Sequence, residues 1–237
     1  MGTVKLNDLL FRSSIEFPCS YIKGNQERRF YVSISVPDCT NIVSELTKRG
    51  FRRNYNHMYI PSCKDCNSCI SSRINIKQFI FSKSNKRNLK INNDLSLVVN
   101  KDYNEKRFNL FKYYCRIRHT NGGMKSMTEN EFIGFFHKST NETKIFDLID
   151  KDEKLYGSIL LDILNDGYSA VYSFFNPDLN KRGLGKNLIL KTIENMKHNQ
   201  GNYLYIGYWV KESENMNYKS SFNNIEYFKE GNWSPSI

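Results

Sequence analysis

The residues of this chain that could do chemistry gather first around three cysteines, Cys63, Cys66 and Cys69, which recur at a spacing of three. This is the local spacing of thiolate ligands to zinc or to an iron–sulfur cluster. A four-ligand site needs another donor, and Cys19 is the candidate because the Tyr-x-x-Gly turn after it would present its sulfur. The alternative is a loop of reduced thiols without metal, and the sequence leaves both interpretations open.

A second group lies in the segment Arg182-Gly183-Leu184-Gly185-Lys186, where a strand is expected to pass through a loop into a helix. Backbone N–H groups at such a junction can bind phosphate. The coenzyme A signature of acetyltransferases has a second glycine where this chain has Asn187. That side chain would crowd a pyrophosphate, so the pattern favours an RNA phosphate or a tRNA 3′ end. A plain helix start is the alternative.

A third group combines rings with one cation. Tyr208 and Trp209 end an expected buried strand, which would place a phenol and an indole at the mouth of a cleft. Lys219 follows shortly after and offers a cation for an acidic ligand. Ordinary core packing explains the neighbouring Tyr205 and Phe222 equally well.

The charge of the chain points to a polyanionic partner. Its 237 residues include 35 Lys and Arg against 24 Asp and Glu, a formal net charge of +11. Each phosphate that such a surface neutralises releases counterions, which favours nucleic acid; a solvated, lysine-rich surface is the alternative. The candidate RNA-binding residues are Lys83, Lys86, Arg87, Lys90, Arg116 and Arg118.

Composition excludes several classes of protein. Apolar residues make up 39% of the chain and aromatic residues 14%, which is not a disordered composition. Charged residues within 1–17 leave no apolar signal-peptide core, and no run reaches the roughly 18 apolar residues of a membrane span. We therefore expect a soluble, cytoplasmic protein with no membrane partner, whose six cysteines stay thiols or bind metal. No Walker loop, His-x3-His pair or nucleophile elbow is present.

Hydrophobic periodicity predicts an α/β (α+β) fold in two parts, a smaller cysteine-containing domain over residues 1–95 and a second domain over residues 104–230. In the second, Asn165-Asp166-Gly167 joins two strands, and a helix and a further strand follow. This β-β-α-β order matches the core of GCN5-related N-acyltransferases, a likeness of fold alone. The predicted helices are residues 40–49, 84–93, 104–119, 128–136 and 184–197, and the predicted strands are 29–36, 51–60, 70–81, 155–164, 168–175 and 203–210.

The motifs follow one another in the order of a known family. In the first half they are Pro18-Cys19-x-Tyr21-x2-Gly24, Gly50-Phe51-Arg52-Arg53, Tyr59-x-Pro61-x-Cys63-x2-Cys66-x2-Cys69 and Arg73. In the second half they are Arg118-His119-x2-Gly122-Gly123-Met124, Pro177-Asp178, Arg182-x-Leu184-Gly185, Tyr205-x-Gly207-Tyr208-Trp209-Val210 and Met216-x-Tyr218-Lys219-x2-Phe222. From about residue 8 to about residue 228, the chain resembles the arginyl-tRNA–protein transferase family, in particular its compact bacterial branch.

The resemblance implies an enzyme, an aminoacyltransferase that moves an aminoacyl group from a charged tRNA to the α-amine of a protein's N-terminal residue. In the bacterial branch the donor is leucyl-tRNA and the acceptor begins with Asp or Glu. The product carries an N-terminal leucine, a degradation signal of the N-degron (N-end rule) pathway. Eukaryotic relatives have a Cys-x2-Cys at the N-terminal turn and have been linked to an iron–sulfur cluster, whereas Ile22 replaces the second cysteine here. We expect no required cofactor, with zinc or an iron–sulfur cluster as the open alternative.

The implied reaction needs positioning more than strong catalysis. An aminoacyl ester is already activated, and an N-terminal amine has a pKa of about 7.7–8.0, so alignment of the two can supply roughly 7–11 kcal/mol. We expect the acidic side chain of the acceptor to meet Lys219, with Arg52 or Arg73 as competitors.

The other candidates divide by role. Tyr208 would hydrogen-bond the ester or shuttle a proton, while Asp178 or His119 would hold the ammonium or accept its proton. The leucine side chain would lie among Phe174, Trp209 and neighbouring apolar residues. Tyr218 and Arg182 are further substrate-binding candidates from the matching motifs.

Three other functions remain open from the sequence. Arginyl-tRNA could be the donor for the same acceptors. A coenzyme A-dependent N-acetyltransferase would explain the expected β-β-α-β core. A non-enzymatic, metal-stabilised RNA-binding module would explain the charge and the cysteines.

Overall fold

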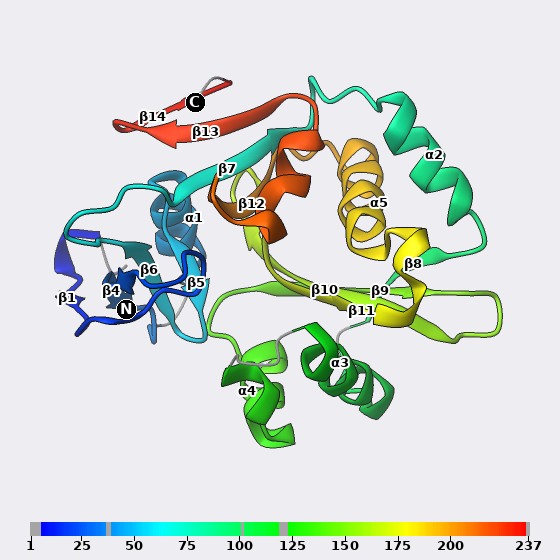
Figure 1. The fold of residues 1–237 in the computed structure, drawn as a ribbon, viewed down its shortest axis with the longest axis horizontal. Coiled ribbons are helices and arrows are strands. Elements are labelled where there is room, and N and C mark those ends of the chain that lie inside the picture. Colours follow the sequence, from blue (N-terminus) through cyan, green and yellow to red (C-terminus); the bar gives the residue numbers. More distant parts are fainter. Residues whose placement is uncertain (1–5, 37–38, 101, 119–122, 236–237) are drawn as a thin grey trace.

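An eight-stranded sheet forms the centre of the molecule in the computed structural model, which describes residues 6–36, 39–100, 102–118 and 123–235. In spatial order its strands are β14 (Asn232–Ser234), β13 (Ile225–Lys229), β7 (Ile70–Asn75), β12 (Tyr203–Trp209), β11 (Gly167–Phe175), β10 (Leu155–Leu164), β9 (Thr143–Ile149) and β8 (Ser96–Val99). Helix α5 (Leu184–His198) and helix α2 (Lys83–Ile91) lie on one side, and α3 (Glu105–Arg118) and α4 (Glu129–His137) on the other (Figure 1).

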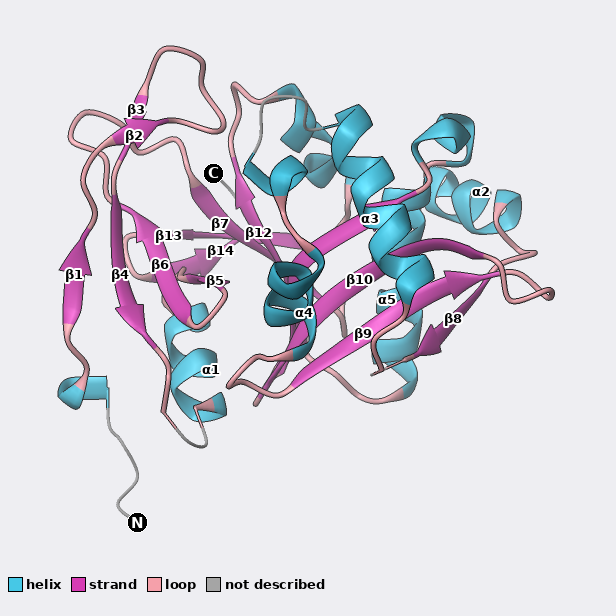
Figure 2. Cartoon of the chain, turned by 90° about the horizontal axis from the view of Figure 1, so that it is seen from below, coloured by secondary structure: helices cyan, strands magenta, loops and turns pink. Residues whose placement is uncertain are grey.

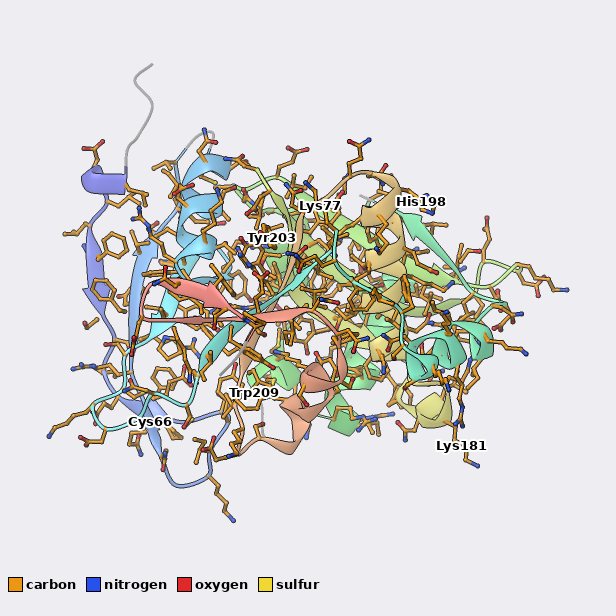
Figure 3. All side chains as sticks on the ribbon, turned by 90° about the horizontal axis from the view of Figure 1, so that it is seen from above. Cys66, Lys77, Lys181, His198, Tyr203 and Trp209 are labelled. Carbon is orange, nitrogen blue, oxygen red and sulfur yellow. The ribbon has the colours of Figure 1, made fainter. Side chains whose placement is uncertain are left out.

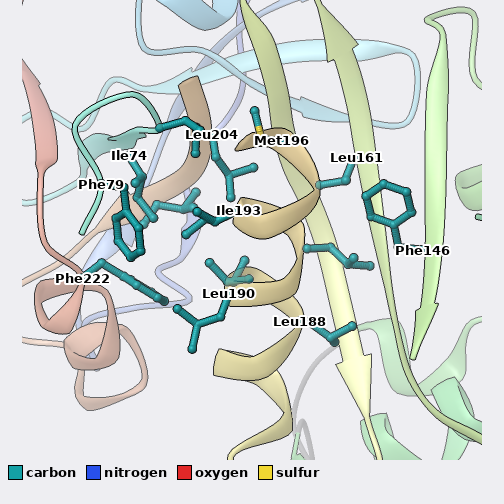
Figure 4. Packing of buried hydrophobic residues seen from close by; sticks show 14 of the residues in the cluster. Ile74, Phe79, Phe146, Leu161, Leu188, Leu190, Ile193, Met196, Leu204 and Phe222 are labelled. Carbon is teal, nitrogen blue, oxygen red and sulfur yellow. The ribbon is translucent and has the colours of Figure 1, made fainter. Parts of the chain in front are cut away.

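Two apolar layers hold these helices to the sheet. The buried stripe of α5, including Leu188, Leu190 and Ile193, packs against Ile74 and Leu204 of the sheet (Figure 4). On the opposite face, α3 and α4 lie over β9, β10 and β11 (Figure 2) and contribute a cluster dominated by phenylalanine rings. A helix with one apolar stripe is stable only when that stripe is covered, which the sheet provides here.

The predicted β-β-α-β unit is present as β10, β11, α5 and β12. Gly167 makes the turn between β10 and β11 possible, because any Cβ at this residue would lie 2.0 Å from the Tyr203 carbonyl oxygen. Strands β10 and β11 are antiparallel, and β11 and β12 are parallel. The fold is therefore mixed α/β with a GCN5-related N-acyltransferase-like core and a smaller N-terminal part that carries the cysteine loop, which confirms the predicted class.

Strands β11 and β12 diverge soon after they begin. Their pairing covers only Gly167–Ser169 with Tyr203–Tyr205, and β12 has an irregularity between Tyr205 and Gly207. We call the opening between β11 from Ala170 onward and β12 from Gly207 onward the strand fork. It is the place where the two parts of the chain meet.

The N-terminal part has its own four-stranded sheet in the order β1-β4-β6-β5. Helix α1 packs beside it around Val43 and Leu46 and ends before Gly50, whose φ is +88°. The elements are η1 (Leu6–Asp8), β1 (Phe11–Ser13), β2 (Phe17–Pro18), β3 (Gln26–Glu27), β4 (Arg29–Ser33), α1 (Thr40–Lys48), β5 (Arg52–Asn54) and β6 (His57–Pro61).

The eight-stranded sheet takes strands from both sides of the predicted boundary near residue 95. Strand β7 from the first part lies between β12 and β13 of the second. The predicted strand 70–81 ends at residue 75, and the predicted strand 29–36 ends at residue 33. The division into 1–95 and 104–230 remains a prediction. No helix among the described residues combines the length and apolar content needed to cross a bilayer.

Candidate active site

Arg52 fills the strand fork. It stands at the start of β5, and its Nη2 donates hydrogen bonds to the backbone carbonyls of Ala170, at 2.7 Å, and Val171, at 3.3 Å, on β11. On the β12 side, a methyl group on Gly207 would lie 2.5 Å from Arg52 Nη1, so only glycine leaves room for the guanidinium. Nη1 itself is buried and has no hydrogen-bond partner among the described residues. The guanidinium thus presents an unused donor inside an acyltransferase-like fork.

Lys219 lies beside Arg52, in the η4 segment (Glu214–Ser221) after β12. Only 4% of its surface is exposed, and its Nζ donates to the backbone carbonyl of Tyr208. Burial, and then the positive charge of Arg52, hold the pKa of Lys219 well below its ordinary value. Desolvation without a compensating anion has this effect on any lysine.

Lys219 differs from the other buried cations of the described residues, which are all arginines. Arg53 Nε lies 2.7 Å from Asp162, Arg73 Nη2 lies 2.7 Å from Glu226, and Arg107 Nη2 lies 2.6 Å from Asp147. Each of these guanidiniums is therefore neutralised by a carboxylate of the chain itself. Lys219 has no such partner among the described residues, and neither has the half-buried Arg52.

Arg73 is consequently in a different situation from its two predicted competitors. Besides its pair with Glu226, its guanidinium lies 3.7 Å from the centre of the Tyr203 ring and 4.4 Å from that of Trp233. The structure brings Arg52 and Lys219 together. Arg73, in contrast, is already occupied by its ion pair with Glu226 and by the rings of Tyr203 and Trp233.

Tyrosines line the surroundings of the two cations. The Tyr208 hydroxyl donates to backbone carbonyls, 3.0 Å from that of Tyr59 and 3.2 Å from that of Gly50. Burial raises the pKa of Tyr208 well above its usual value, so the phenol stays neutral. Tyr218 is 44% exposed and marks where the site opens to solvent, although burial by its surroundings raises its pKa to about 12. Arg52, Tyr208, Tyr218 and Lys219 together are called the cationic recess below.

The predicted leucine-binding residues are not brought together. Phe174 is fully buried among Phe111, Phe132 and Phe136 beneath α3 and α4. Trp209 is half-buried and packs against the cluster around α5, with its ring centre 5.7 Å from that of Tyr227. Its indole Nε1 is buried and has no hydrogen-bond partner among the described residues. Trp209 follows Tyr208 directly along β12, but its ring contact, like those of Phe174, lies in the apolar clusters and not in the recess.

The four cysteines form one cluster, as the spacing predicted. Cys63 and Cys66 face each other in an isolated antiparallel bridge, and the N–H groups of Tyr21 and Ile22 each lie 3.4 Å from the Cys19 sulfur. Burial, and then the neighbouring Cys19, Glu27, Cys63 and Cys66, raise the pKa of the Cys69 thiol to about 12. All four cysteines are free and half-buried.

A metal does not fit this cluster as the structure has it. Among the described residues, no group of three or more His, Cys, Asp or Glu side chains is arranged to hold a metal ion. The prediction of zinc or an iron–sulfur cluster at Cys19, Cys63, Cys66 and Cys69 is therefore not supported. Ile22 stands where the eukaryotic pattern has a second cysteine. Burial raises the pKa of the Cys69 thiol, which favours its protonated form.

The loop before α5 is tied down by α2. Asn187 is fully buried, and its Nδ2 donates to Asn88 Oδ1 at 3.0 Å. Asn88 Nδ2 in turn donates to the carbonyls of Arg182, at 3.1 Å, and Gly183, at 3.2 Å. Arg182 Nε donates to Asn92 Oδ1 at 2.9 Å, and its Nη2 pairs with Asp94. The residue that replaces the second glycine of the coenzyme A signature thus holds α2 in place.

Asp178 and Arg182 both lie in η3 (Pro177–Arg182), outside the cationic recess. Asp178 Oδ1 accepts a hydrogen bond from the Tyr113 hydroxyl of α3 at 2.7 Å. Arg182 is paired with α2 through Asp94. His119 falls outside the described residues, so its predicted role stays a prediction.

The basic residues predicted to bind RNA flank η3 on two sides. Lys83, Lys86, Arg87 and Lys90 are exposed on α2, which has no acidic residue. Arg116 and Arg118 are exposed at the end of α3, and Arg118 Nη2 donates to Asn180 of η3 at 2.5 Å. Lys181 of η3 lies near one end of the long axis and Cys66 near the other, with Trp209 between them (Figure 3). The six residues and Lys181 are called the basic rim below.

Two open, polar hollows lie at the other end of β11 and β12 from the strand fork. They share Asn202, and Asp166 and Tyr203 are among their lining residues. The cation among their lining residues, Lys77, is exposed to solvent, and Asp166 accepts from the Tyr205 hydroxyl at 2.9 Å. The chemistry therefore concentrates at the strand fork.

Sequence reasoning missed three residues at this site. Tyr21 and Tyr59 act electrostatically on Tyr208, and Gly207 makes room for Arg52. All three lie inside motifs that carry the family resemblance, so position within a motif was the signal that could have found them.

Comparison with known proteins identifies the family of the chain. Residues 17–87 match the family model described as arginine-tRNA-protein transferase, N terminus, and residues 106–229 match the one described as arginine-tRNA-protein transferase, C terminus. Proteins named aspartate/glutamate leucyltransferase are similar: that of Dinoroseobacter shibae is 35% identical over 92% of this chain and 80% of the relative. That of Granulibacter bethesdensis is 36% identical over 92% and 82%, and that of Saccharophagus degradans 33% over 96% and 97%.

Among solved structures, one described as FemX is similar with a TM-score of 0.49 and 9% identity, over 81% of this chain and 67% of that one. The fold and the site define an acyltransferase-like protein with a cationic recess at its strand fork. The chain belongs to the arginine-tRNA-protein transferase family, whose relatives of this length are aminoacyltransferases.

Proposed function

We propose that this protein transfers leucine from leucyl-tRNA to the N-terminal Asp or Glu of proteins, and so marks them for N-degron degradation in the cytoplasm. The observation that carries the proposal is the cationic recess: a buried lysine and a buried guanidinium nitrogen, neither paired with a carboxylate in the part of the chain that the structure describes. A pocket with this charge suits an acidic side chain. The names of the similar leucyltransferases agree with it.

Acceptor recognition is assigned to Arg52 first and Lys219 beside it. The carboxylate of an N-terminal Asp or Glu would accept from Arg52 Nη1, the donor that the chain leaves unused. An N-terminal Asn or Gln is uncharged and would accept a weaker hydrogen bond from this donor than a carboxylate does. The site would therefore favour Asp and Glu acceptors over Asn and Gln. Arg73 is a weaker candidate because it is already neutralised by Glu226.

Donor binding is assigned to the basic rim. Helices α2 and α3 present the exposed cations on both sides of η3, which supports a path for the tRNA acceptor end toward the strand fork. The bonds between Asn187, Asn88 and the Arg182–Gly183 loop support RNA over coenzyme A at this junction. Asp178, His119 and Arg182 are proposed to lie along the donor's path.

Chemistry requires mainly that the amine meet the ester carbon. Tyr218, at the exposed side of the recess, is proposed to contact the leucyl group together with Trp209, which packs against the α5 cluster, with Phe174 supporting the sheet beneath. Tyr208 keeps the wall of the recess in place through its bonds to the carbonyls of Gly50 and Tyr59. When both reactants are held in this way, their binding energy aligns the amine with the ester carbon. This alignment requires no cofactor.

The test supplies purified protein with leucyl-tRNA or arginyl-tRNA, each carrying a labelled amino acid, and with peptides beginning Asp, Glu, Arg and Ala. The expected result is labelled leucine on the Asp and Glu peptides only. Labelled arginine on the same peptides would replace the proposed donor. No label on any peptide, together with binding of acetyl-coenzyme A in a titration, would overturn the proposal in favour of an acetyltransferase.

A further inference from the structure

Lys219 has a property that acceptor binding alone does not require. Lys219 is only 4% exposed and has no carboxylate partner among the described residues, and such burial favours the uncharged form of a lysine. Arg52, which carries a permanent charge, adds to this effect from β5. Burial therefore favours an uncharged amine at Lys219 in the free enzyme, at the place where an ammonium would be expected to bind a carboxylate.

The other titratable groups around Lys219 do not restore its charge. Tyr208 of β12 and Tyr218 of η4 have raised pKa values and stay neutral, as does Tyr59 of β6. Tyr114 of α3 is also neutral, because burial raises its pKa. The Tyr208 carbonyl accepts one N–H from Lys219 Nζ, which leaves the lone pair of the uncharged amine available.

We propose that Lys219 is the proton acceptor for the α-ammonium of the acceptor protein. This inference rests on the proposed function. In an N-terminal Asp, two carbon atoms separate the carboxylate carbon from the α-nitrogen. A carboxylate held by Arg52 Nη1 therefore brings the α-ammonium to the neighbouring Lys219.

The proton balance closes without any further reagent. One N–H bond of the α-ammonium breaks as an N–H bond forms on Lys219 Nζ. The freed lone pair attacks the ester carbon, and the ribose oxygen leaves with the second proton that the nitrogen sheds. The new Lys219 ammonium pairs with the acceptor's carboxylate and returns its proton to solvent when the product departs. Only an acidic acceptor both delivers the proton and stabilises the charge, so proton transfer depends on acceptor identity.

Calorimetry on the full chain can follow this proton. Two peptides of the same sequence are titrated at pH 7, one beginning with Asp and one with a succinyl group, which keeps the carboxylate and lacks the α-amine. Each titration is repeated in phosphate and in Tris, whose ionisation enthalpies differ, to count protons exchanged with buffer. We expect close to one proton taken up with the succinyl peptide and close to none with the Asp peptide, whose own ammonium supplies it.

Variants assign the proton to its residue. Lys219→Met should abolish uptake with the succinyl peptide, while Lys211→Met, at an exposed lysine earlier in the same segment, should leave it unchanged. General base catalysis contributes about 10²–10⁴-fold, so transfer to the Asp peptide by Lys219→Met at pH 7 should fall in that range. The deficit should narrow as the pH rises above the amine's own pKa, about 7.7–8.0.

Several results would overturn the inference. They are equal proton uptake with both peptides, no uptake or no binding with the succinyl peptide, uptake that survives Lys219→Met, or a deficit that does not vary with pH. Should Lys219→Met fail to fold, the two wild-type titrations decide the question alone. Failure of the proposed function is seen separately, as absence of labelled leucine on the Asp peptide with the wild-type protein.

Discussion

Two consecutive arginines on β5 meet opposite environments. Arg53 points into the junction between the N-terminal sheet and β10, where Asp162 holds it with both carboxylate oxygens, at 2.7 and 2.9 Å. Arg52 points into the strand fork, where it finds only backbone carbonyls and where Nη1 stays unused. The charge of Arg53 is neutralised within the chain, whereas Arg52 has no carboxylate partner among the described residues.

The difference separates a structural cation from a functional one. Arg53 also has one buried nitrogen, Nη2, without a hydrogen-bond partner among the described residues, but Asp162 neutralises its charge. A guanidinium that is fixed by carbonyls keeps its full charge and a free donor for a carboxylate from outside. The alternation of side chains along β5 assigns the two roles to neighbouring residues.

We expect the largest effect from Asp162→Asn, because this substitution leaves the buried charge of Arg53 without its counter-ion. Such changes cost about 3–5 kcal/mol, so the free energy of unfolding in urea should fall by that amount. Glu45→Gln removes an exposed partner of Lys48 and should change it by less than about 1 kcal/mol. Equal effects of the two substitutions would mean that the junction does not depend on the pair.

On the open side, Arg52→Met should affect activity more than stability. A hydrogen bond to a charged group is worth about 1.5–3 kcal/mol, so kcat/KM for an Asp acceptor should fall roughly ten- to hundredfold. Selectivity for Asp over Asn should fall with it, as measured with paired peptides. Arg49→Met, at an exposed arginine nearby, is the control. Unchanged selectivity would remove Arg52 from acceptor recognition.

Lys219 makes the stability of the open side depend on pH. Its pKa is lowered in the folded state, so the unfolded chain binds the extra proton below about pH 10.4, and folding loses stability as the pH falls. For each pH unit below pH 10, the free energy of unfolding of the wild type should fall by up to about 1.4 kcal/mol relative to that of Lys219→Met. Urea unfolding at pH 10, 9, 8 and 7 measures this, and a constant difference between the two proteins would contradict it.

The smallest effects are expected on the basic rim. Lys86→Gln and Arg87→Gln should each weaken tRNA binding a few-fold and reduce the slope of log affinity against log salt by about 0.7–0.9. Lys77→Gln, at an exposed lysine away from the rim, should leave the slope unchanged. A similar reduction of the slope for Lys77→Gln would show that tRNA binding depends on the overall positive charge of the protein and not on the basic rim.

Much of the fold could be predicted because its periodic segments are local. Helices α1, α3, α4 and α5 and strands β10, β11 and β12 all agree with their patterns to within a few residues. Strand β9 was missed because Asp147 interrupts its apolar run, and the sequence does not show that Arg107, 40 residues away, neutralises it. Strands β8 and β13 are short and depend on partners that are distant in sequence, and β14, three residues long, pairs only with the adjacent β13.

The candidate site, like the fold, could be predicted from the sequence only in part. Residue types and motifs identified Arg52, Lys219 and Tyr208, but nothing local distinguishes Arg52 from Arg73. The distinction comes from Glu226, 153 residues beyond Arg73, and from the burial of Lys219. The metal site at the cysteines stays a prediction for a related reason: spacing reports neighbours along the chain and not the arrangement of sulfurs in space, and the described residues show no group arranged to hold a metal ion.

The position of β7 sets the order in which a nascent chain can finish folding. Strand β13 pairs with β7 at residues that the ribosome makes about 150 positions later, so the sheet closes only near the end of synthesis. A chain released before residue 225 would present one edge of β7 unpaired, and such an edge recruits other chains. Truncated products of this protein should therefore aggregate rather than persist as active fragments.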